Sequence, residues 1–206
     1  MYVPKINLWQ NETEVLDFIQ KNTFATVCVT DDIGKIHAVH IPVLYQHHDT
    51  ISILHGHVAK GNPVIDAIEK GKQALIIFAG AHSYISSSWY ADENVSTWNY
   101  LSVHVYGTLQ KLTEEELIVS LTQLTQVFEN GRDNARTVDT MSDRMFNREL
   151  RGIVGFKLQI ESVDAKKKMS QNRNDADYKI IVEKLSESVD PIDNQVSGIM
   201  KKERAL

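Results

Sequence analysis

The pattern that most constrains the fold is a long alternation of apolar and polar residues over 97–111. Leu101, Val103 and Val105 fall on one face of a strand in this segment, and polar residues lie between them. A long strand with one apolar face is typical of an antiparallel sheet that covers a core on one side. We therefore predict a sheet-based fold in which this segment is a principal strand.

Further segments have strand patterns, and the turns between them favour antiparallel pairing. Turn residues at 31–34 predict a β-hairpin, and a polar turn is expected at 46–49. The segment 73–80 is continuously apolar, which predicts a strand that is buried on both faces. These further strands are expected at 24–30, 35–45, 50–57, 73–80 and 152–163.

Capping residues mark the expected helices. Asn11 stands three residues before Glu14, and Thr113 with Glu116 makes a capping box. Asn62 suits an N-cap and Pro63 suits the first turn of the helix that follows. A loop is expected at 130–140. The helices are predicted at 11–22, 63–70, 113–128 and 142–150, the third with an apolar stripe of Leu117, Leu121, Leu124, Val127 and Phe128.

These elements predict a mainly β fold of the α+β class. About six strands, with helices inserted after the third and the fifth, indicate a mostly antiparallel barrel with peripheral helices. We place a barrel domain at 1–165 and a C-terminal helical extension at 166–206. The extension has too few apolar residues to fold alone, and its segment 188–195 resembles a linker.

Composition limits the partners and the compartment. The net charge of −5 and the isoelectric point near 5.9 give no overall attraction to nucleic acid or to anionic membranes. The single cysteine, Cys28, excludes an intrachain disulfide, lies in an apolar strand and is expected to be a buried structural thiol. No apolar stretch approaches the length of a membrane span, so we expect a soluble cytoplasmic protein with no membrane partner.

Aromatic residues gather between His82 and Gly107. This stretch contains two of the three tryptophans and four of the seven tyrosines, with polar residues between them. Such a surface can stack on a flat ligand and bind its edge. An aromatic hairpin that fills the end of the barrel is an equally good interpretation at this point.

Two other short segments suggest ligand contacts. His37 and His40 are three residues apart in a strand and therefore lie on opposite faces, so one of them faces a ligand or a partner. Lys60, Gly61 and Asn62 precede a helix and could hold a phosphate, although an ordinary capped helix has the same pattern.

Several motifs occur in the order of one known family. They are MYVPK, HAVHIPVL, LHGHVAKGNP, ALIIFAGAHSYISSSWY, STWNYLSVHVYG and IVGFKLQIESVDAKKKMSQNR. Together they resemble the PaiB family of bacterial FMN-binding negative regulators of transcription. The resemblance implies a split β-barrel like that of pyridoxamine 5'-phosphate oxidase, and a homodimer with FMN at the subunit interface.

The resemblance also implies where the flavin would lie. The phosphate would bind near Lys60, Gly61 and Asn62. The ring would lie along the strand that includes His37, Val39, His40 and Ile41, with His57 nearby. Aromatic and polar residues from the partner subunit would close the slot, and the candidates are Trp89, Tyr90, Trp98, Asn99 and Tyr100.

The chain departs from the usual sequence of this family at three positions. Ser87 stands where a proline is common, which removes a fixed backbone angle. Lys60 replaces an arginine and loses bidentate geometry, and Gly61 replaces an alanine. These changes predict weaker FMN binding, and a haem in place of the flavin is an alternative.

Other site types have less support. No spacing of histidines matches a zinc pattern, so we predict no metal. Two basic patches suit a solvated face better than a DNA-binding surface. They are residues 166–168 with Arg173, and the cluster Lys201, Lys202 and Arg204. We expect no helix-turn-helix, because the expected helices lack a compact pair joined by a turn of three or four residues.

The resemblance predicts an FMN-binding negative regulator of transcription, of the type that represses sporulation and degradative-enzyme genes. DNA remains a partner that no visible motif supports. We predict no catalytic residues. The alternatives are a flavin-dependent oxidoreductase acting on a small molecule, with His40 and His104 as proton-transfer candidates, and a ligand-binding protein with a degenerate flavin site.

Overall fold

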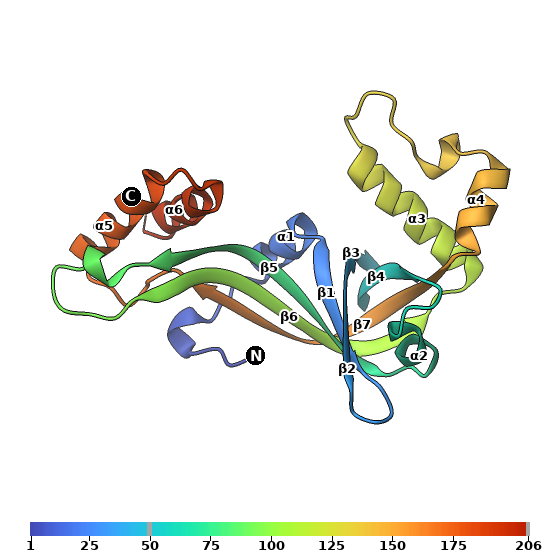
Figure 1. Cartoon of the computed structure of the whole chain (residues 1–206), viewed down its shortest axis with the longest axis horizontal. Helices are drawn as coiled ribbons and strands as arrows, with labels where there is room; N and C mark the ends of the chain where they lie inside the picture. Colours follow the sequence, from blue (N-terminus) through green and yellow to red (C-terminus); the bar gives the residue numbers. More distant parts are fainter. Residues whose placement is uncertain (49–50, 205–206) are drawn as a thin grey trace. The chain divides into compact units, whose positions relative to one another are not determined.

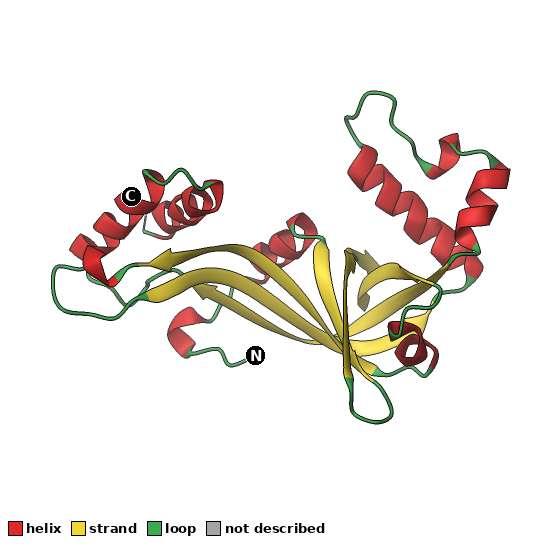
Figure 2. Ribbon diagram, in the orientation of Figure 1, coloured by secondary structure: helices red, strands yellow, loops and turns green. Residues whose placement is uncertain are grey.

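Strands form the framework of the chain, as the alternation at 97–111 predicts. The computed structural model describes residues 1–48 and 51–204, and Figures 1 and 2 show its elements. Strand β6 has the predicted bounds, Thr97–Lys111. The other described strands are β1 (Phe24–Thr30), β2 (Ile36–Pro42), β3 (Leu44–His48), β4 (Ile51–Ala59), β5 (Gln73–Ile85) and β7 (Ile153–Lys168).

Most predicted helices are confirmed together with their caps. Asn11 accepts a hydrogen bond from the Glu14 amide, and Thr113 and Glu116 form the expected capping box. The described α-helices are α1 (Glu12–Lys21), α2 (Val64–Glu69), α3 (Glu114–Glu129), α4 (Asp143–Leu150), α5 (Asp175–Ser186) and α6 (Pro191–Glu203). Three short 3-10 helices are η1 (Lys5–Asn7), η2 (Ser87–Trp89) and η3 (Val138–Thr140).

The two edges of the sheet come close together at one point. Its order is β2-β1-β5-β6-β7-β4-β3, so β2 and β3 are its two edges, yet only Val43 separates them in sequence. Pro42 ends β2, as expected of a residue without an amide hydrogen. A side chain at Gly56 on β4 would come within 2.9 Å of the Pro42 carbonyl oxygen, so glycine permits this close approach of the edges. The sheet therefore curls into a barrel around Val43.

The chain divides into two compact units. The first unit contains residues 1–22, 78–104 and 164–206. The Phe18 ring of α1 lies where a side chain at Gly80 would stand. Helices α5 and α6 pack together, and the Tyr178 hydroxyl donates a 2.9 Å hydrogen bond to the Met200 carbonyl. The buried apolar residues of the predicted extension in this core are Met169, Tyr178, Ile181, Val182, Leu185, Val196 and Met200.

The second unit contains residues 23–77 and 105–163. It holds the curled part of the sheet, and its core includes Val27, Leu54, Ile76, Val105, Phe156 and Leu158. Helix α3 packs on the sheet through polar contacts as well as apolar ones. Ser120 is hydrogen-bonded to His55 of β4, and Glu116 forms an ion pair with Lys157 of β7.

Several expectations about buried faces are wrong. Strand β5 alternates between buried and half-buried residues, because an antiparallel strand covers the core with one face only. Only Leu117 of the expected α3 stripe is buried, while Val127 and Phe128 are exposed. Cys28 is half-buried on β1, and burial raises the pKa of its thiol.

Two predicted connections are also wrong. Gln46 to His48 belong to β3 rather than to a turn. The remaining turn residue, 49, lies outside the described residues, as do 50 and 205–206. The expected linker at 188–195 contains the start of α6, because Asp190 caps the helix and Pro191 occupies its first turn. Strand β7 continues to Lys168, and the domain boundary at 165 stays a prediction.

Candidate functional site

The predicted phosphate residues lie in the turn between β4 and α2. Gly61 has a φ of +92°, and nothing lies within 4 Å of the place a side chain would take. The Lys60 amide donates a 2.8 Å hydrogen bond to the Gly152 carbonyl, which ties the turn to the start of β7. The turn therefore has an open, glycine-dependent backbone beside an exposed lysine.

The expected helix start is one residue too early. Pro63 is the N-cap of α2, and the Asn62 side chain accepts a 3.0 Å hydrogen bond from the Val64 amide. Because α2 has only six residues and that amide is already bonded, the helix offers little to an anion.

Cationic side chains meet in a cleft beside this turn. The cleft has a volume of about 470 Å³, and Lys60, Lys111 and Arg151 are among its lining residues, with Glu114 as the carboxylate. Lys111 forms a 3.1 Å ion pair with Glu69. Lys60 and Arg151 form no ion pair with a described residue, so a phosphate could bind between them without competing for an internal partner.

Sequence reasoning missed Lys111 and Arg151. They stand at the end of β6 and directly after α4, far from Lys60 in the chain. No local motif marks them, and only the pairing of the strands brings these ends together.

The predicted ring-binding strand is β2, an edge of the sheet. His37 and His40 lie on opposite faces, as expected. His37 Nε2 is 2.9 Å from Asp31 Oδ2, and this hydrogen bond is the main reason for the lowered pKa of Asp31. His40 is exposed, with its ring 6.3 Å from that of Phe24. Val39 and Ile41 are half-buried.

His57 lies on β4 opposite Gly155 of β7. It is half-buried, and burial lowers the pKa of its imidazole, which favours the neutral form.

The predicted aromatic wall belongs to the first unit and has two kinds of members. Trp98 is 52% exposed, and its ring lies 6.1 Å from His82 and 5.8 Å from Tyr84. The Lys166 ammonium lies 5.2 Å from the centre of the Tyr100 ring. These side chains form a surface that can stack on a flat group.

The other predicted residues of this wall, Asn99, Tyr90 and Trp89, pack largely inside the first unit. Asn99 is fully buried, accepts a hydrogen bond from Ser170 and donates one to Met200 Sδ. Tyr90 is buried beneath the Arg173 guanidinium, and its hydroxyl has no hydrogen-bond partner among the described residues. Trp89 is half-buried in η2, where Ser86 rather than a proline fixes the turn by accepting from the Ser88 amide.

The predicted flavin residues therefore fall into two groups. Those of β2, β4 and the following turn belong to the second unit, and the aromatic residues belong to the first. A common slot formed by both groups stays a prediction.

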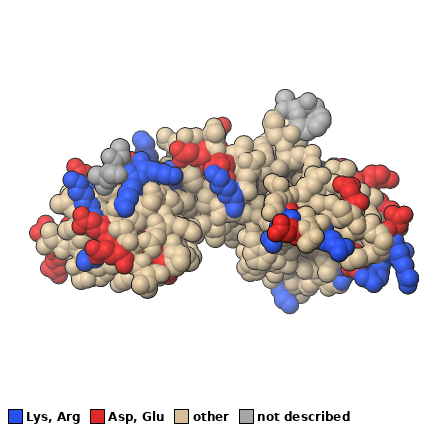
Figure 3. Space-filling model, turned by 90° about the horizontal axis from the view of Figure 1, so that it is seen from above, with Lys and Arg blue, Asp and Glu red and all other residues tan. Residues whose placement is uncertain are grey.

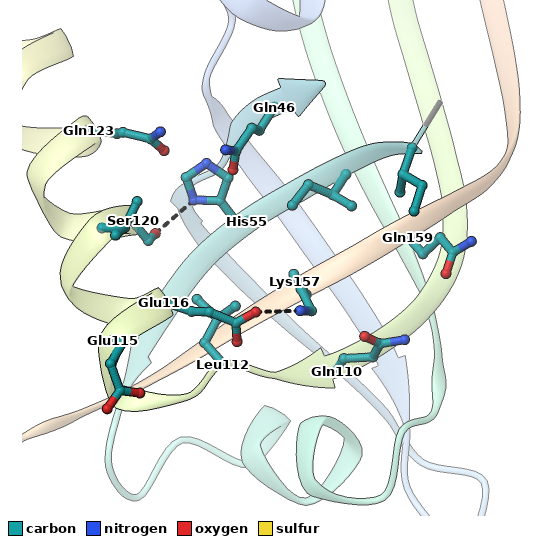
Figure 4. Close-up of a pocket in the computed structure, with 13 residues that line it drawn as sticks. Gln46, His55, Gln110, Leu112, Glu115, Glu116, Ser120, Gln123, Lys157 and Gln159 are labelled. Atoms are coloured by element: carbon teal, nitrogen blue, oxygen red, sulfur yellow. Dashed lines mark hydrogen bonds and ion pairs between the residues drawn. The ribbon is translucent and has the colours of Figure 1, made fainter. Parts of the chain in front are cut away.

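A second cavity lies in the second unit between α3 and the sheet. Its volume is about 680 Å³, and Figure 4 shows its walls. His55 Nδ1 is 2.7 Å from Ser120 Oγ, and Lys157 Nζ is 2.6 Å from Glu116 Oε1. Burial lowers the pKa of His55, and the Lys157 hydrogen bond lowers the pKa of Glu116. Sequence reasoning did not select His55 as a site residue, because no nearby motif predicts the helix that covers it.

The basic run at 166–168 is partnered instead of solvated. Lys167 forms ion pairs of 2.8 and 2.6 Å with Glu14 and Glu203, and it lies 4.8 Å from the centre of the Trp9 ring. Lys168 is hydrogen-bonded to Thr97. These cations stabilise the first unit and are poorly placed to attract DNA.

The prediction that no compact helix pair exists is wrong. Helices α5 and α6 are joined by four residues, 187–190, because the expected linker is partly helical. Residues 175–204 nevertheless have seven acidic and five basic side chains, which disfavours contact with a phosphate backbone. Acidic and basic groups are also interspersed on the face shown in Figure 3.

The described residues contain neither a membrane-spanning helix nor a metal-binding cluster. Over residues 1–48 and 51–204, no helix is both long and apolar enough to cross a membrane. The same residues contain no group of three or more His, Cys, Asp or Glu side chains arranged to hold a metal ion.

Comparison with known proteins agrees with this fold. The chain is 41% identical over 201 residues to the protease synthase and sporulation protein PAI 2 of Bacillus subtilis, covering 98% of this chain and 97% of that protein. Two solved structures share the fold. The FAD and heme binding protein of Mycobacterium smegmatis has a TM-score of 0.55 at 20% identity, covering 79% of this chain and 73% of that one. The flavocytochrome Anf3 of Azotobacter vinelandii has a TM-score of 0.53 at 14% identity, covering 82% and 74%.

These likenesses confirm the predicted α+β split barrel with peripheral helices. Residues 1–162 match the family FMN_bind_2, described as "Putative FMN-binding domain". With this match and the full-length similarity to PAI 2, the chain belongs to the FMN_bind_2 family of FMN-binding domains, with FMN as its cofactor.

Proposed function

We propose that the phosphate of FMN binds in the cleft beside Lys60. The convergence of Lys60, Lys111 and Arg151 is the observation that carries this proposal. A dianionic phosphate needs charged donors, and neither Lys60 nor Arg151 forms an ion pair with a residue that the structure describes. Gly61 leaves the backbone of the turn open to a close ligand. When bound, FMN supplies a redox-active, flat ring system.

The ring would lie against the β2 edge, and a second copy of the chain would cover it. The outer side of an edge strand has main-chain donors and acceptors that can bind the polar edge of a ring. Phe24 of β1 and Ile36 of β2 are exposed apolar side chains, which favour coverage by a partner. The exposed Trp98 of the second copy is the best candidate for stacking on the flavin.

At the level of the cell, the protein would act as a cytoplasmic negative regulator of transcription. The support is its similarity over almost the whole chain to a protein named for protease synthesis and sporulation. Regulation would be indirect, because the basic run at 166–168 is bonded internally and the α5–α6 pair has an acidic balance. Gel-shift titration at low salt should therefore give no sequence-specific complex, and a complex that weakens steeply with salt would favour direct DNA binding.

A comparison of FMN with riboflavin tests the phosphate proposal. The two ligands share the ring and differ in the phosphate, so the cleft should favour FMN by about tenfold or more. Quenching of flavin fluorescence in a titration of the full chain measures both affinities. Equal affinities would show that the phosphate does not use the cleft.

A further inference from the structure

The cavity between α3 and the sheet contains a buried imidazole with one free nitrogen. His55 is 3% exposed and lines the cavity. Its Nδ1 is bonded to Ser120, while no described residue is a hydrogen-bond partner of its Nε2. In Figure 4 the ring lies between Ser120 and Gln46. This nitrogen is a hydrogen-bonding atom of the cavity wall that no described residue engages, so it is available to a bound molecule.

Four side-chain amides face the same cavity. Gln46 and Gln123 are near His55, while Gln110 and Gln159 are at the other end, near Lys157 (Figure 4). None of these amides forms a side-chain hydrogen bond with a described residue. Each has donors and an acceptor, so together they suit a ligand that has both kinds of group at both ends.

The charges of the cavity exclude an anion. Lys157 is its cation, and Glu116 neutralises it at 2.6 Å. Glu115 adds a second carboxylate, and the lowered pKa of His55 keeps the imidazole neutral near pH 7. A phosphate would find no uncompensated positive charge here, in contrast to the cleft beside Lys60.

We propose that this cavity is a second small-molecule site, which binds an uncharged heterocyclic amide of nucleoside size. Carboxamide side chains pair well with the polar edge of such a ring, and Ile51, Ile53 and Val119 offer apolar contacts for its faces. The volume of about 680 Å³ lies within the range of small-molecule pockets. This cavity differs from the proposed flavin cleft, although Leu112 lines both, and it extends the protein's function to a second ligand.

Calorimetric titration of the full chain, saturated with FMN, with inosine, uridine and their 5'-monophosphates tests the proposal. The expected result is saturable binding of at least one nucleoside, with its monophosphate at least about tenfold weaker because of the missing cation. Flavin absorbance of the same sample reports FMN binding independently, so failure of one site is distinguishable from failure of the other.

A matched pair of variants on α3 locates the ligand. Gln123→Leu removes a lining amide and should weaken nucleoside binding by about threefold to tenfold. Gln126→Leu makes the same change at an exposed position of that helix and should leave binding within about twofold. An NMR shift of the His55 Nε2 signal on nucleoside addition, identified by its loss in His55→Gln, would place the ligand at the imidazole.

Three results would overturn the proposal. One is the absence of saturable nucleoside binding up to about 5 mM. Another is equal affinity for nucleoside and monophosphate, which would show that charge does not govern the cavity. The third is displacement of the nucleoside by FMN, which would make the cavity part of the flavin site.

Discussion

His55 and Ser120 share a 2.7 Å hydrogen bond although 65 residues separate them in the chain. Both residues are buried, one on β4 and the other on α3. Because most of the apolar stripe of α3 remains at least partly exposed, this polar contact helps Leu117 and the Glu116–Lys157 ion pair to fix the helix on the sheet.

Removal of the Ser120 hydroxyl should destabilise the protein. Ser120→Ala leaves His55 Nδ1 without a partner, at a cost of about 1–3 kcal/mol in the free energy of unfolding. Thr122→Ala is the matched control, because the Thr122 hydroxyl bonds only within α3, to the Ile118 carbonyl, and its loss should cost less than about 0.5 kcal/mol. Urea unfolding measures both, and equal losses would show that the His55 contact adds nothing.

Stability should fall as the pH drops below the ordinary pKa of histidine. Burial lowers the pKa of folded His55 below its value in the unfolded chain, so between these two values the unfolded state binds more protons. The free energy of unfolding then decreases with falling pH by up to about 1.4 kcal/mol per unit for this residue.

His55→Gln should reduce that slope by up to one proton as the pH falls below about 6.5. His57 and His104, whose pKa values are also lowered mainly by burial, retain the rest of the slope in this variant. Urea unfolding over this pH range measures it, and an unchanged slope would mean that folded His55 titrates normally.

Substitution of alanine for glycine should have opposite effects on stability at Gly107 and Gly198. A side chain at Gly107 would overlap the Gln159 carbonyl oxygen of the neighbouring strand, so Gly107→Ala should cost roughly 3 kcal/mol or more. Gly198 lies within α6 with open space around it, so Gly198→Ala should stabilise by about 0.5–1 kcal/mol. Melting temperatures that move in the same direction for both would contradict this packing.

Lys167 should be important for the first unit despite its place in a charged run. Its side chain is 12% exposed between Glu14 and Glu203. Lys167→Ala would leave two carboxylates without their cation and should cost about 1–3 kcal/mol. Lys179→Ala, at an exposed position on α5, should change stability by less than about 0.5 kcal/mol. A loss of less than about 0.5 kcal/mol in both variants would mean that Lys167 contributes no more than a solvated surface lysine, as its sequence suggests.

Local chemistry explains which parts of the fold the sequence predicts well. The Asn11 and Thr113 caps, the Asp31–Gly34 turn and the alternation of β6 each depend on residues a few positions apart. The end of β2 and the start of β3 on either side of Val43 could not be predicted in this way. The continuous strand pattern through 35–45 does not show that the chain changes there from one edge of the sheet to the other.

The candidate site shows the same limit. Lys60 stands in a recognisable turn, whereas Arg151 becomes its neighbour in the cleft only through the return of the chain along β7. Lys166, Lys167 and Lys168 form a charged run in sequence, but a strand directs successive side chains to opposite faces. They therefore contact residues that are distant in sequence, namely Tyr100, Glu14 and Thr97.

A fluorescence titration with a double variant of the cleft shows whether Lys60 and Arg151 hold the phosphate of FMN. Lys60→Ala with Arg151→Ala should weaken FMN binding by about tenfold to a hundredfold and leave riboflavin binding unchanged, because charge-assisted contacts to the phosphate alone are lost. Lys35→Ala, which removes an exposed lysine of the β1–β2 turn, should bind FMN as the unaltered protein does. Full FMN affinity in the double variant would contradict the account.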